Sequence, residues 1–170
     1  MQLTATVVTD AGIHLVWDRA YFAGVHDYDT WSKELEEDQA IRDHIVAGHI
    51  VPVNIHRDGS FTLVVRVESS SMPNLSEAEE RHVAERSEPY RFACQGHVDV
   101  SGIEYVHSEA GRLVASMELL PGSYDVVVHL MDYDDVLQRT DAHPDFVITI
   151  GPARAQLPRQ SVDTFSKNPE

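Results

Sequence analysis

The sequence predicts a mainly β protein, an antiparallel β-sandwich of about eight or nine strands with short helical insertions. Short runs of β-branched and aromatic residues recur along the chain, turn residues separate them, and the long alternating helices of βαβ units are missing. A length of 170 residues corresponds to one domain. We expect a single sandwich domain over residues 1–152. Residues 153–170 lack periodicity and are expected to form a flexible C-terminal tail.

Strands in the first half are expected to pair as two hairpins. Residues 4–8 and 13–17 flank the turn sequence Asp10-Ala11-Gly12. An Asp-Gly pair at 58–59 separates two further β-branched runs, Ile50–His56 and Phe61–Val67, and is a strong hairpin signal. Pro52 cannot donate a ladder hydrogen bond, which predicts an edge strand or a bulge.

Helical signals interrupt the strands in two places. Residues Thr30–Ala47 favour two short helices, the second capped by Asp38 and ended by Gly48. A capping-box pattern that begins at Ser76 predicts a further helix that runs to about Arg86. The later strands are expected at Tyr90–Cys94, Val98–Val100, Ile103–Val106, Leu113–Leu119, Tyr124–Met131 and Phe146–Ile150.

The chain is strongly acidic, with 13 basic and 28 acidic residues and a net charge of −15. This balance argues against binding to nucleic acid, because phosphate contacts need an excess of lysine and arginine. The acids gather in three segments, Asp27–His44, Glu77–Glu88 and Asp132–Asp145, with net charges of −5, −3 and −4. Either they are solvated connections, or they form a negative surface for a basic partner.

No catalytic or cofactor motif is found, so we expect a protein that is not an enzyme and has no cofactor. Cys94 is the single cysteine and is expected in the core. The ten histidines raise the question of a metal, and the best local cluster is His129 with the Asp132–Asp145 loop. That loop fails the spacing of an EF-hand, since Leu137 stands where the central glycine belongs, and we assign no metal site.

The lone cysteine and the lack of a long apolar run predict a cytoplasmic protein with no membrane partner. Aromatic side chains among the acids are candidate anchors for a protein interface, and Tyr133 is expected to be exposed. The alternative is that Trp31 packs inward and its acids only solubilise a helix. Trp17 is expected in the core. The candidate partner-binding residues are Tyr28, Trp31, Glu34, Glu36, Glu37, Asp132, Tyr133, Asp134 and Asp135.

The order of segments is similar to that of the competence-protein-J-like family, inhibitors of a bacterial DNA-entry nuclease. One matching block contains an N-terminal strand pair, an acidic stretch with Trp31, and the strand from Gly48 into Asp58-Gly59. The other runs from Tyr90 through Gly102-Ile103-Glu104 to the sequence Leu119–Tyr124. The resemblance implies a small acidic β protein that blocks a nuclease by binding, and it transfers no inhibitory residue.

We therefore expect a non-enzymatic, acidic, intracellular protein that binds a basic protein partner, such as a nuclease, in the manner of an inhibitor or immunity protein. The alternative is a β-barrel or sandwich that binds a small molecule or a metal. A third interpretation is an oligomeric module that pairs through the edge strand containing Pro52.

Overall fold

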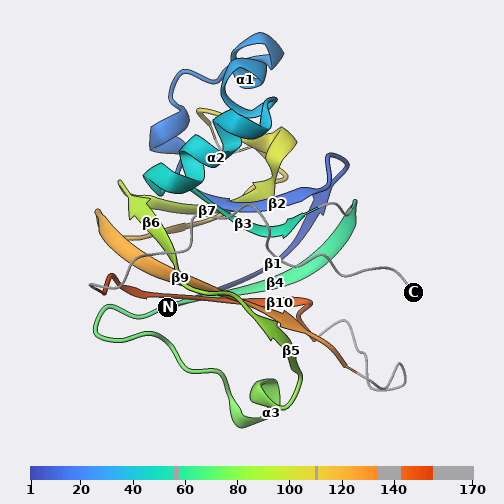
Figure 1. The fold of residues 1–170 in the computed structure, drawn as a ribbon, viewed down its shortest axis with the longest axis vertical. Coiled ribbons are helices and arrows are strands. Elements are labelled where there is room, and N and C mark those ends of the chain that lie inside the picture. The colour runs from blue at the N-terminus through green and yellow to red at the C-terminus, as the bar shows by residue number, and fades with distance from the viewer. Residues whose placement is uncertain (56–57, 110, 134–142, 155–170) are drawn as a thin grey trace.

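Two β-sheets face each other across the core, and helices cover the outer face of the smaller sheet (Figure 1). The computed structural model describes residues 1–55, 58–109, 111–133 and 143–154. Within these residues the six-stranded and four-stranded sheets form a β-sandwich with few and short helices, which confirms the predicted fold class. The described residues contain ten strands, slightly more than the sequence indicated.

The larger sheet has the order β1, β4, β10, β9, and two short strands share the far edge of β9. Strand β5 pairs with the last residues of β9, and β6 pairs with its first residues. Strands β10 and β4 are parallel, whereas the other pairs of this sheet are antiparallel. The bounds are β1 Gln2–Thr9, β4 Gly59–Val67, β5 Val83–Arg86, β6 Tyr90–Cys94, β9 Gly122–Met131 and β10 Phe146–Pro152.

The smaller sheet has the order β3, β2, β7, β8, with bounds β3 Ile50–Ile55, β2 Ile13–Trp17, β7 His97–Gly102 and β8 Ala115–Glu118. Strand β3 lies at an edge. Its register against β2 shifts where His14 pairs with Asn54 and Leu15 pairs with Pro52. The expectation that Pro52 marks an edge or a bulge is confirmed, and both features are present.

Both predicted hairpins are wrong, because each pair of strands is divided between the two sheets. Strand β1 pairs with β4, and β2 pairs with β3, so Thr9 lies opposite Gly59 and Ile13 lies opposite Ile55. The four strands form a long antiparallel ribbon that bends from one sheet into the other. Because of the bend, the apolar face of β1 and β4 packs against the sheet that contains β2 and β3. A simple hairpin would keep both of its strands in one sheet.

The helical insertion contains η1 (Arg19–Phe22), α1 (Tyr28–Leu35) and α2 (Asp38–Ala47), and so has the two predicted short helices. Asp38 is not the cap of α2, since that position falls to Glu37, which makes no side-chain capping hydrogen bond. Gly48 ends α2 with a left-handed backbone, φ 78°, and its N–H donates to the carbonyls of the last turn.

Two other elements differ from the prediction. The Ser76 capping box is present, but its helix α3 covers only Glu77–Glu80, and the chain then extends into β5. Residues 103–106 were expected as a strand, and Ile103–Tyr105 instead form the 3-10 turn η2. In the first case residues expected in a helix form a strand, and in the second residues expected in a strand form a 3-10 turn. In both cases the tertiary surroundings outweigh the local propensity.

The main core is formed by the facing sides of the sheets and continues beneath the helices. Trp17 is fully buried, as expected, and its Nε1 donates to Ser101 Oγ at 3.0 Å. Leu35 and Ile45 bury the inner faces of α1 and α2 in the same cluster. Cys94 is buried and forms no disulfide, which agrees with its predicted core position.

A second, smaller apolar cluster lies on the outer face of the larger sheet. Val64, Met131 and Val147 are covered there by residues that include Leu75 and Tyr133. No helix in the described residues is long and apolar enough to cross a membrane. At the start of the predicted tail, Arg154 N–H donates to Asp125 Oδ2 at 2.9 Å, and residues 155–170 lie outside the described residues.

Candidate functional site

The first residues of α1 are held in place by a reciprocal cap. Asp27 Oδ1 accepts from the Thr30 N–H at 2.9 Å, and Thr30 Oγ1 accepts from the Asp27 N–H at 3.1 Å. These hydrogen bonds from Thr30 lower the pKa of the Asp27 carboxyl. The cap therefore fixes the direction of α1 and the position of the two aromatic residues in its first turn.

Trp31 is half-buried and packs against the main core. Its Nε1 donates to the Ile103 carbonyl at 2.9 Å, which ties α1 to η2. Tyr28 stacks on Trp31 with ring centroids 5.9 Å apart and an interplanar angle of 23°. Tyr28 is 68% exposed. Of the two candidate aromatic residues, Tyr28 is therefore open to solvent, and Trp31 packs against its ring.

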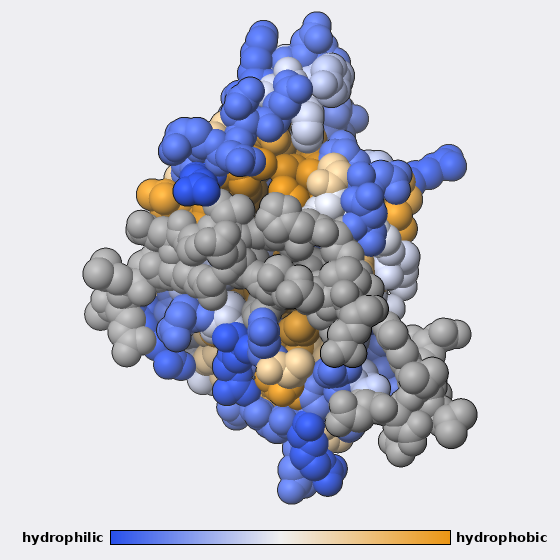
Figure 2. All heavy atoms as spheres, turned by 45° about the vertical axis from the view of Figure 1, so that its right-hand side comes forward, coloured by the Kyte–Doolittle hydropathy of each residue, from blue (hydrophilic) through white to orange (hydrophobic). Residues whose placement is uncertain are grey.

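A groove of about 720 Å³ opens between α1 and the segment that follows η2. We call it the helical-end groove. Leu113 is 51% exposed in the wall opposite Tyr28, and the lining is mostly apolar. On the face drawn in Figure 2, apolar surface at the helical end of the molecule lies among hydrophilic side chains. The lining residues are Val25, Asp27, Tyr28, Trp31, Glu104, Tyr105, Val106, His107, Glu109, Gly111, Arg112, Leu113 and Val114.

The charged groups of the groove are mainly acidic, with Asp27, Glu104 and Glu109 against Arg112. Glu104 is positioned by two hydrogen bonds, from Thr9 Oγ1 at 2.8 Å and from the Asp10 N–H at 2.7 Å.

The phenol of Tyr105 also lines the groove and stays neutral near pH 7. Burial, followed by the charges of Glu104 and Asp10, raises its pKa above the ordinary value of 10. The groove thus offers apolar and aromatic surface with carboxylates at its rim, an arrangement that suits an apolar group carried by a cationic ligand.

The three predicted glutamates of this region are exposed, but they do not line the groove. Glu34 Oε2 lies 3.1 Å from His44 Nε2, and Glu36 Oε1 accepts a long hydrogen bond of 3.4 Å from Tyr28 Oη. Glu37 precedes α2 as its cap residue. These carboxylates add negative charge beside the groove without touching its apolar floor.

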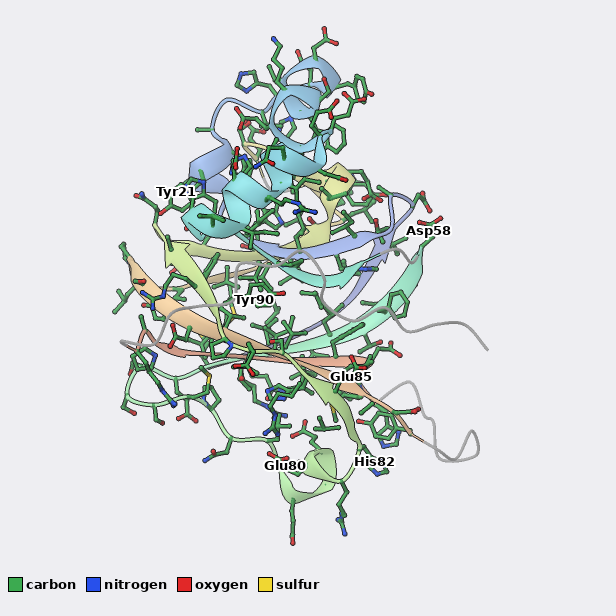
Figure 3. All side chains as sticks on the ribbon, in the orientation of Figure 1. Tyr21, Asp58, Glu80, His82, Glu85 and Tyr90 are labelled. Atoms are coloured by element: carbon green, nitrogen blue, oxygen red, sulfur yellow. The ribbon has the colours of Figure 1, made fainter. Side chains whose placement is uncertain are left out.

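Two other predicted partner-binding residues, Asp132 and Tyr133, lie at the far end of the molecule. We call this region, which contains α3, β5 and residues 132–133, the α3 end. Figure 3 shows Glu80, His82 and Glu85 there, opposite Tyr21 at the helical end. Asp132 N–H donates to the His82 carbonyl at 2.8 Å, so two of the three acidic segments meet at this end. Asp134 and Asp135 lie outside the described residues.

The expectation of an exposed Tyr133 is wrong, because its ring is packed between two histidines. The centroid of Tyr133 is 4.6 Å from those of both His82 and His143, and the side chain is half-buried on the second apolar cluster. Burial raises the pKa of its hydroxyl. Tyr133 therefore contributes to the packing of the α3 end.

Two acids of the α3 end are paired with arginines. Glu79 forms a two-pronged ion pair with Arg66, with distances of 2.6 and 2.8 Å, and this pair holds the pKa of Glu79 at about 2. Glu80 pairs with Arg86 at 2.9 Å. These paired carboxylates cannot offer a partner the full charge that the sequence suggests.

The histidines and the cysteine are candidate metal ligands or nucleophiles. The described residues contain no group of three or more His, Cys, Asp or Glu side chains that could hold a metal ion. His129 accepts from Arg86 Nε at Nδ1, and burial together with Arg86 lowers its pKa to about 4. Burial raises the pKa of the Cys94 thiol to about 11, which keeps it protonated.

The sequence did not indicate the second wall of the groove. Residues 103–106 and 113–114 were assigned to strands, so Tyr105, Val106 and Leu113 were not considered as site residues. Gly102 and Gly111 were the available signal for an irregular segment here, because glycines often mark turns and they lie at both ends of this short stretch. That this segment lies against α1 depends on contacts distant in the sequence.

Comparison with known proteins supports the fold. No protein-family model matches the chain, and the search of curated proteins finds no match. A solved structure described as "Crocagin biosynthetic gene J" is similar in fold, with a TM-score of 0.61 and 16% sequence identity. The match covers 91% of this chain and 99% of that one. At this identity the likeness shows a shared fold alone.

Proposed function

We propose that this chain is a non-enzymatic, cytoplasmic binding protein that takes a basic protein partner at its helical end. An apolar side chain of the partner enters the helical-end groove, and cationic residues around that side chain face the carboxylates of the rim and of α1. The observation that carries the proposal is the open apolar groove bordered by acids, with Tyr28 and Leu113 exposed in its walls.

The exposed aromatic and aliphatic side chains give the groove its binding capacity. Large apolar side chains that gather around one hollow on a surface are typical of interaction sites, whereas scattered ones are not informative. Tyr28 needs little ordering on binding, since Trp31 already stacks against it and Trp31 is itself held by Ile103. A partner side chain that displaces water from this groove would act as an anchor.

Charge supports a basic partner. The segment Asp27–His44 has seven acids and two bases, within a chain of net charge −15. Such a field increases the rate of encounter with a cationic protein and weakens as salt is added. A nuclease is the partner that the resemblance to the competence-protein-J-like family suggests, and its basic substrate groove would be the surface that is blocked.

The test is a titration with two cationic peptides of equal charge, one with a central leucine and one with serine in its place. We expect the leucine peptide to bind more tightly at low ionic strength. Tyr28→Ala and Leu113→Ser should each weaken its binding about 30-fold, equivalent to about 2 kcal/mol. Val46→Ser is the matched control, because Val46 is 53% exposed but lies outside the groove.

Two results would overturn the proposal. One is equal affinity of the two peptides for the wild-type protein. The other is an affinity for the leucine peptide that Tyr28→Ala and Leu113→Ser leave unchanged, with far-UV circular dichroism showing intact folds. Trp31→Ala is a poorer probe, since the indole also donates to Ile103 and packs on the core.

A second candidate function is favoured by the size of the same groove. A volume of about 720 Å³ with a mostly apolar lining falls within the range of small-molecule sites. Mass spectrometry of the gently purified protein, before and after denaturation, would detect a bound organic compound. A compound released by the wild type and lost in Leu113→Ser would favour this function over protein binding.

A further inference from the structure

The four outer edges of the two sheets are protected to different degrees. Strand β3 has Pro52 and a bulge, and β8 is four residues long and ends at Glu118. The β5–β6 edge consists of two short strands, with a register shift in β5 and charged residues that include Arg86. Short length, proline, bulges and charge are the usual devices that prevent an edge from pairing with another chain.

Strand β1 has none of these devices. It pairs with β4 over eight residues in unbroken register, and its sequence QLTATVVT contains neither a charge nor a proline. An uncharged strand of this length is unexpected at the border of a protein with a net charge of −15. Strand β1 approaches β7 and β8 of the facing sheet, but in the described residues its ladder hydrogen bonds run to β4 alone.

The ladder shows which backbone groups of β1 are available. Met1 and Val67 exchange both of their hydrogen bonds, each at 2.9 Å, so they form a hydrogen-bonded pair. Such pairs alternate along an antiparallel ladder, which assigns Leu3 and Ala5 to bonds with β4. The N–H and C=O groups of the intervening residues, Gln2, Thr4 and Thr6, therefore point away from the sheet, and their side chains are exposed.

We propose that β1 pairs antiparallel with β1 of a second copy of this chain, around a two-fold axis at Thr4. Thr4 then lies opposite the second copy's Thr4, and Gln2 lies opposite its Thr6, so every outward group in this stretch has a complementary partner. The pairing would end near Val8, because the Val8 carbonyl already lies against Gly102, where an added Cβ would approach it to 2.8 Å.

Apolar side chains on the inner face of β1 favour this occupant. Leu3 and Ala5 are partly buried against the core, and Met1 is 62% exposed at the start of the same row. In the proposed register Leu3 lies across from the second copy's Ala5 in a non-hydrogen-bonded pair, where side chains approach most closely. The second copy thus covers apolar surface that a single copy leaves half-exposed, and no like charges face each other.

The proposed dimer is independent of the proposed binding function, and salt distinguishes the two. Screening reduces the repulsion between two chains of net charge −15, so dimerisation should strengthen as salt is added. Binding of a cationic partner in the groove should weaken under the same conditions. Failure of one proposal therefore leaves the other testable.

Sedimentation equilibrium over micromolar to millimolar concentrations tests the proposal. We expect a reversible dimer for the wild type and for Thr4→Gln. Thr4→Lys should weaken it at least about tenfold, since two ammonium groups then meet at the axis. Gln39→Lys adds the same charge on the exposed face of α2, outside the larger sheet, and should leave the dimer intact.

Hydrogen exchange adds a residue-level readout. The amides of Thr4 and Thr6 should be protected in the wild-type dimer and exchange freely in Thr4→Lys. A wild type that stays monomeric at every concentration, or a dimer that Thr4→Lys does not weaken, would overturn the proposal. Protection of these amides in a monomer would overturn it as well, because another part of the same chain would then cover the edge.

Discussion

The helical end and the α3 end contain similar patterns of acids and aromatics in the sequence, yet they differ in structure. At the helical end Glu36 and Glu37 are exposed, and Tyr28 leaves one face open over an apolar groove. At the α3 end Glu79 and Glu80 are neutralised by arginines, and the aromatic ring is packed between histidines.

The difference teaches that acidic character alone does not identify a docking surface. What matters is whether the fold brings basic side chains to the acids. Strand β4 supplies Arg66 to Glu79 across 13 positions of sequence, whereas the acids of α1 face solvent with a single lysine among them. The proposed binding function therefore falls at the helical end, where the acids are unpaired by arginine, and the following predictions test how the two ends differ.

The largest effect should follow Gly102→Ala, at the residue directly before η2. An added Cβ would lie 2.6 Å from Glu104 Oε2 and 2.8 Å from both Thr9 Cβ and the Val8 carbonyl. The Val8 carbonyl is backbone of β1, and Thr9 Cβ is bonded directly to that backbone, so neither atom can move freely. We expect a loss of about 3 kcal/mol in unfolding free energy by urea titration. Gly24→Ala, which meets nothing within 4 Å, is the control, and equal effects would contradict the close packing of this corner.

Acid should destabilise the protein through His129 of β9, which accepts a hydrogen bond from Arg86 of β5. The pKa of His129 is about 4 in the folded chain and near 6.5 when unfolded, so the unfolded state binds the proton more readily. The stability from neutral His129 is complete above pH 6.5 and declines as the pH falls from 6.5 to 4, by on the order of 2 kcal/mol. Urea titrations at pH 7 and pH 4.5 measure the loss. In His129→Gln the loss should be smaller, and an identical slope would contradict the assignment.

A matched pair of substitutions compares the acids of the two ends. Glu79→Gln removes a carboxylate that Arg66 stabilises, and because water screens this partly exposed pair we expect a cost of about 1–2 kcal/mol at pH 7. Glu36→Gln at the helical end should change stability by less than about 0.5 kcal/mol. Thermal unfolding at constant pH distinguishes them.

The pH dependence of this pair has a definite sign. The pKa of Glu79 is lowered to about 2, so its contribution is present above pH 4.5 and disappears as the pH falls towards 2. The cost of Glu79→Gln should vanish over that range. A cost that is the same at pH 7 and pH 2.5 would show that shape, not charge, is responsible.

The smallest effect is expected at the histidine pair beneath the helices. His44 Nδ1 lies 3.1 Å from His49 Nδ1, so a proton on one of these nitrogens forms a hydrogen bond to the other. Burial and the nearby His44 lower the pKa of His49, although Glu34 opposes the shift, and Tyr21 stacks on the His49 ring. Stability should decline slightly as the pH falls below 6.5. An NMR titration of the His49 imidazole checks the lowered pKa on which this decline depends. Protonation of His49 that leaves the signals of the stacked Tyr21 ring unchanged would contradict the prediction.

The local pattern was sufficient to predict some features of the molecule. The Ser76 capping box, the Gly48 helix end and the edge position of Pro52 each depend on residues within a few positions, and each is confirmed. Trp17 and Cys94 were placed in the core correctly because apolar periodicity marks a buried face regardless of which strands pair. The sandwich class followed from the spacing of short strands and turns.

Features that depend on pairing could not be predicted in this way. The Asp10–Gly12 and Asp58–Gly59 turns look like hairpin turns, but whether a chain reverses within a sheet or crosses to the facing sheet depends on which distant strands cover its apolar faces. The groove wall formed by Tyr105 and Leu113 meets α1 through the bond from Trp31 to Ile103, 72 positions away.

The sequence by itself determined that this is an acidic β-sandwich with two short helices and a buried Trp17, because local propensity and periodicity act over a few residues. The tertiary structure decided which acids are paired, which aromatic residues are open, and which sheet edge is unprotected. The physical reason is that the effect of a charge or an apolar side chain depends on its neighbours in space. Those neighbours, Arg66 beneath Glu79 and Leu113 across from Tyr28, come from distant parts of the chain.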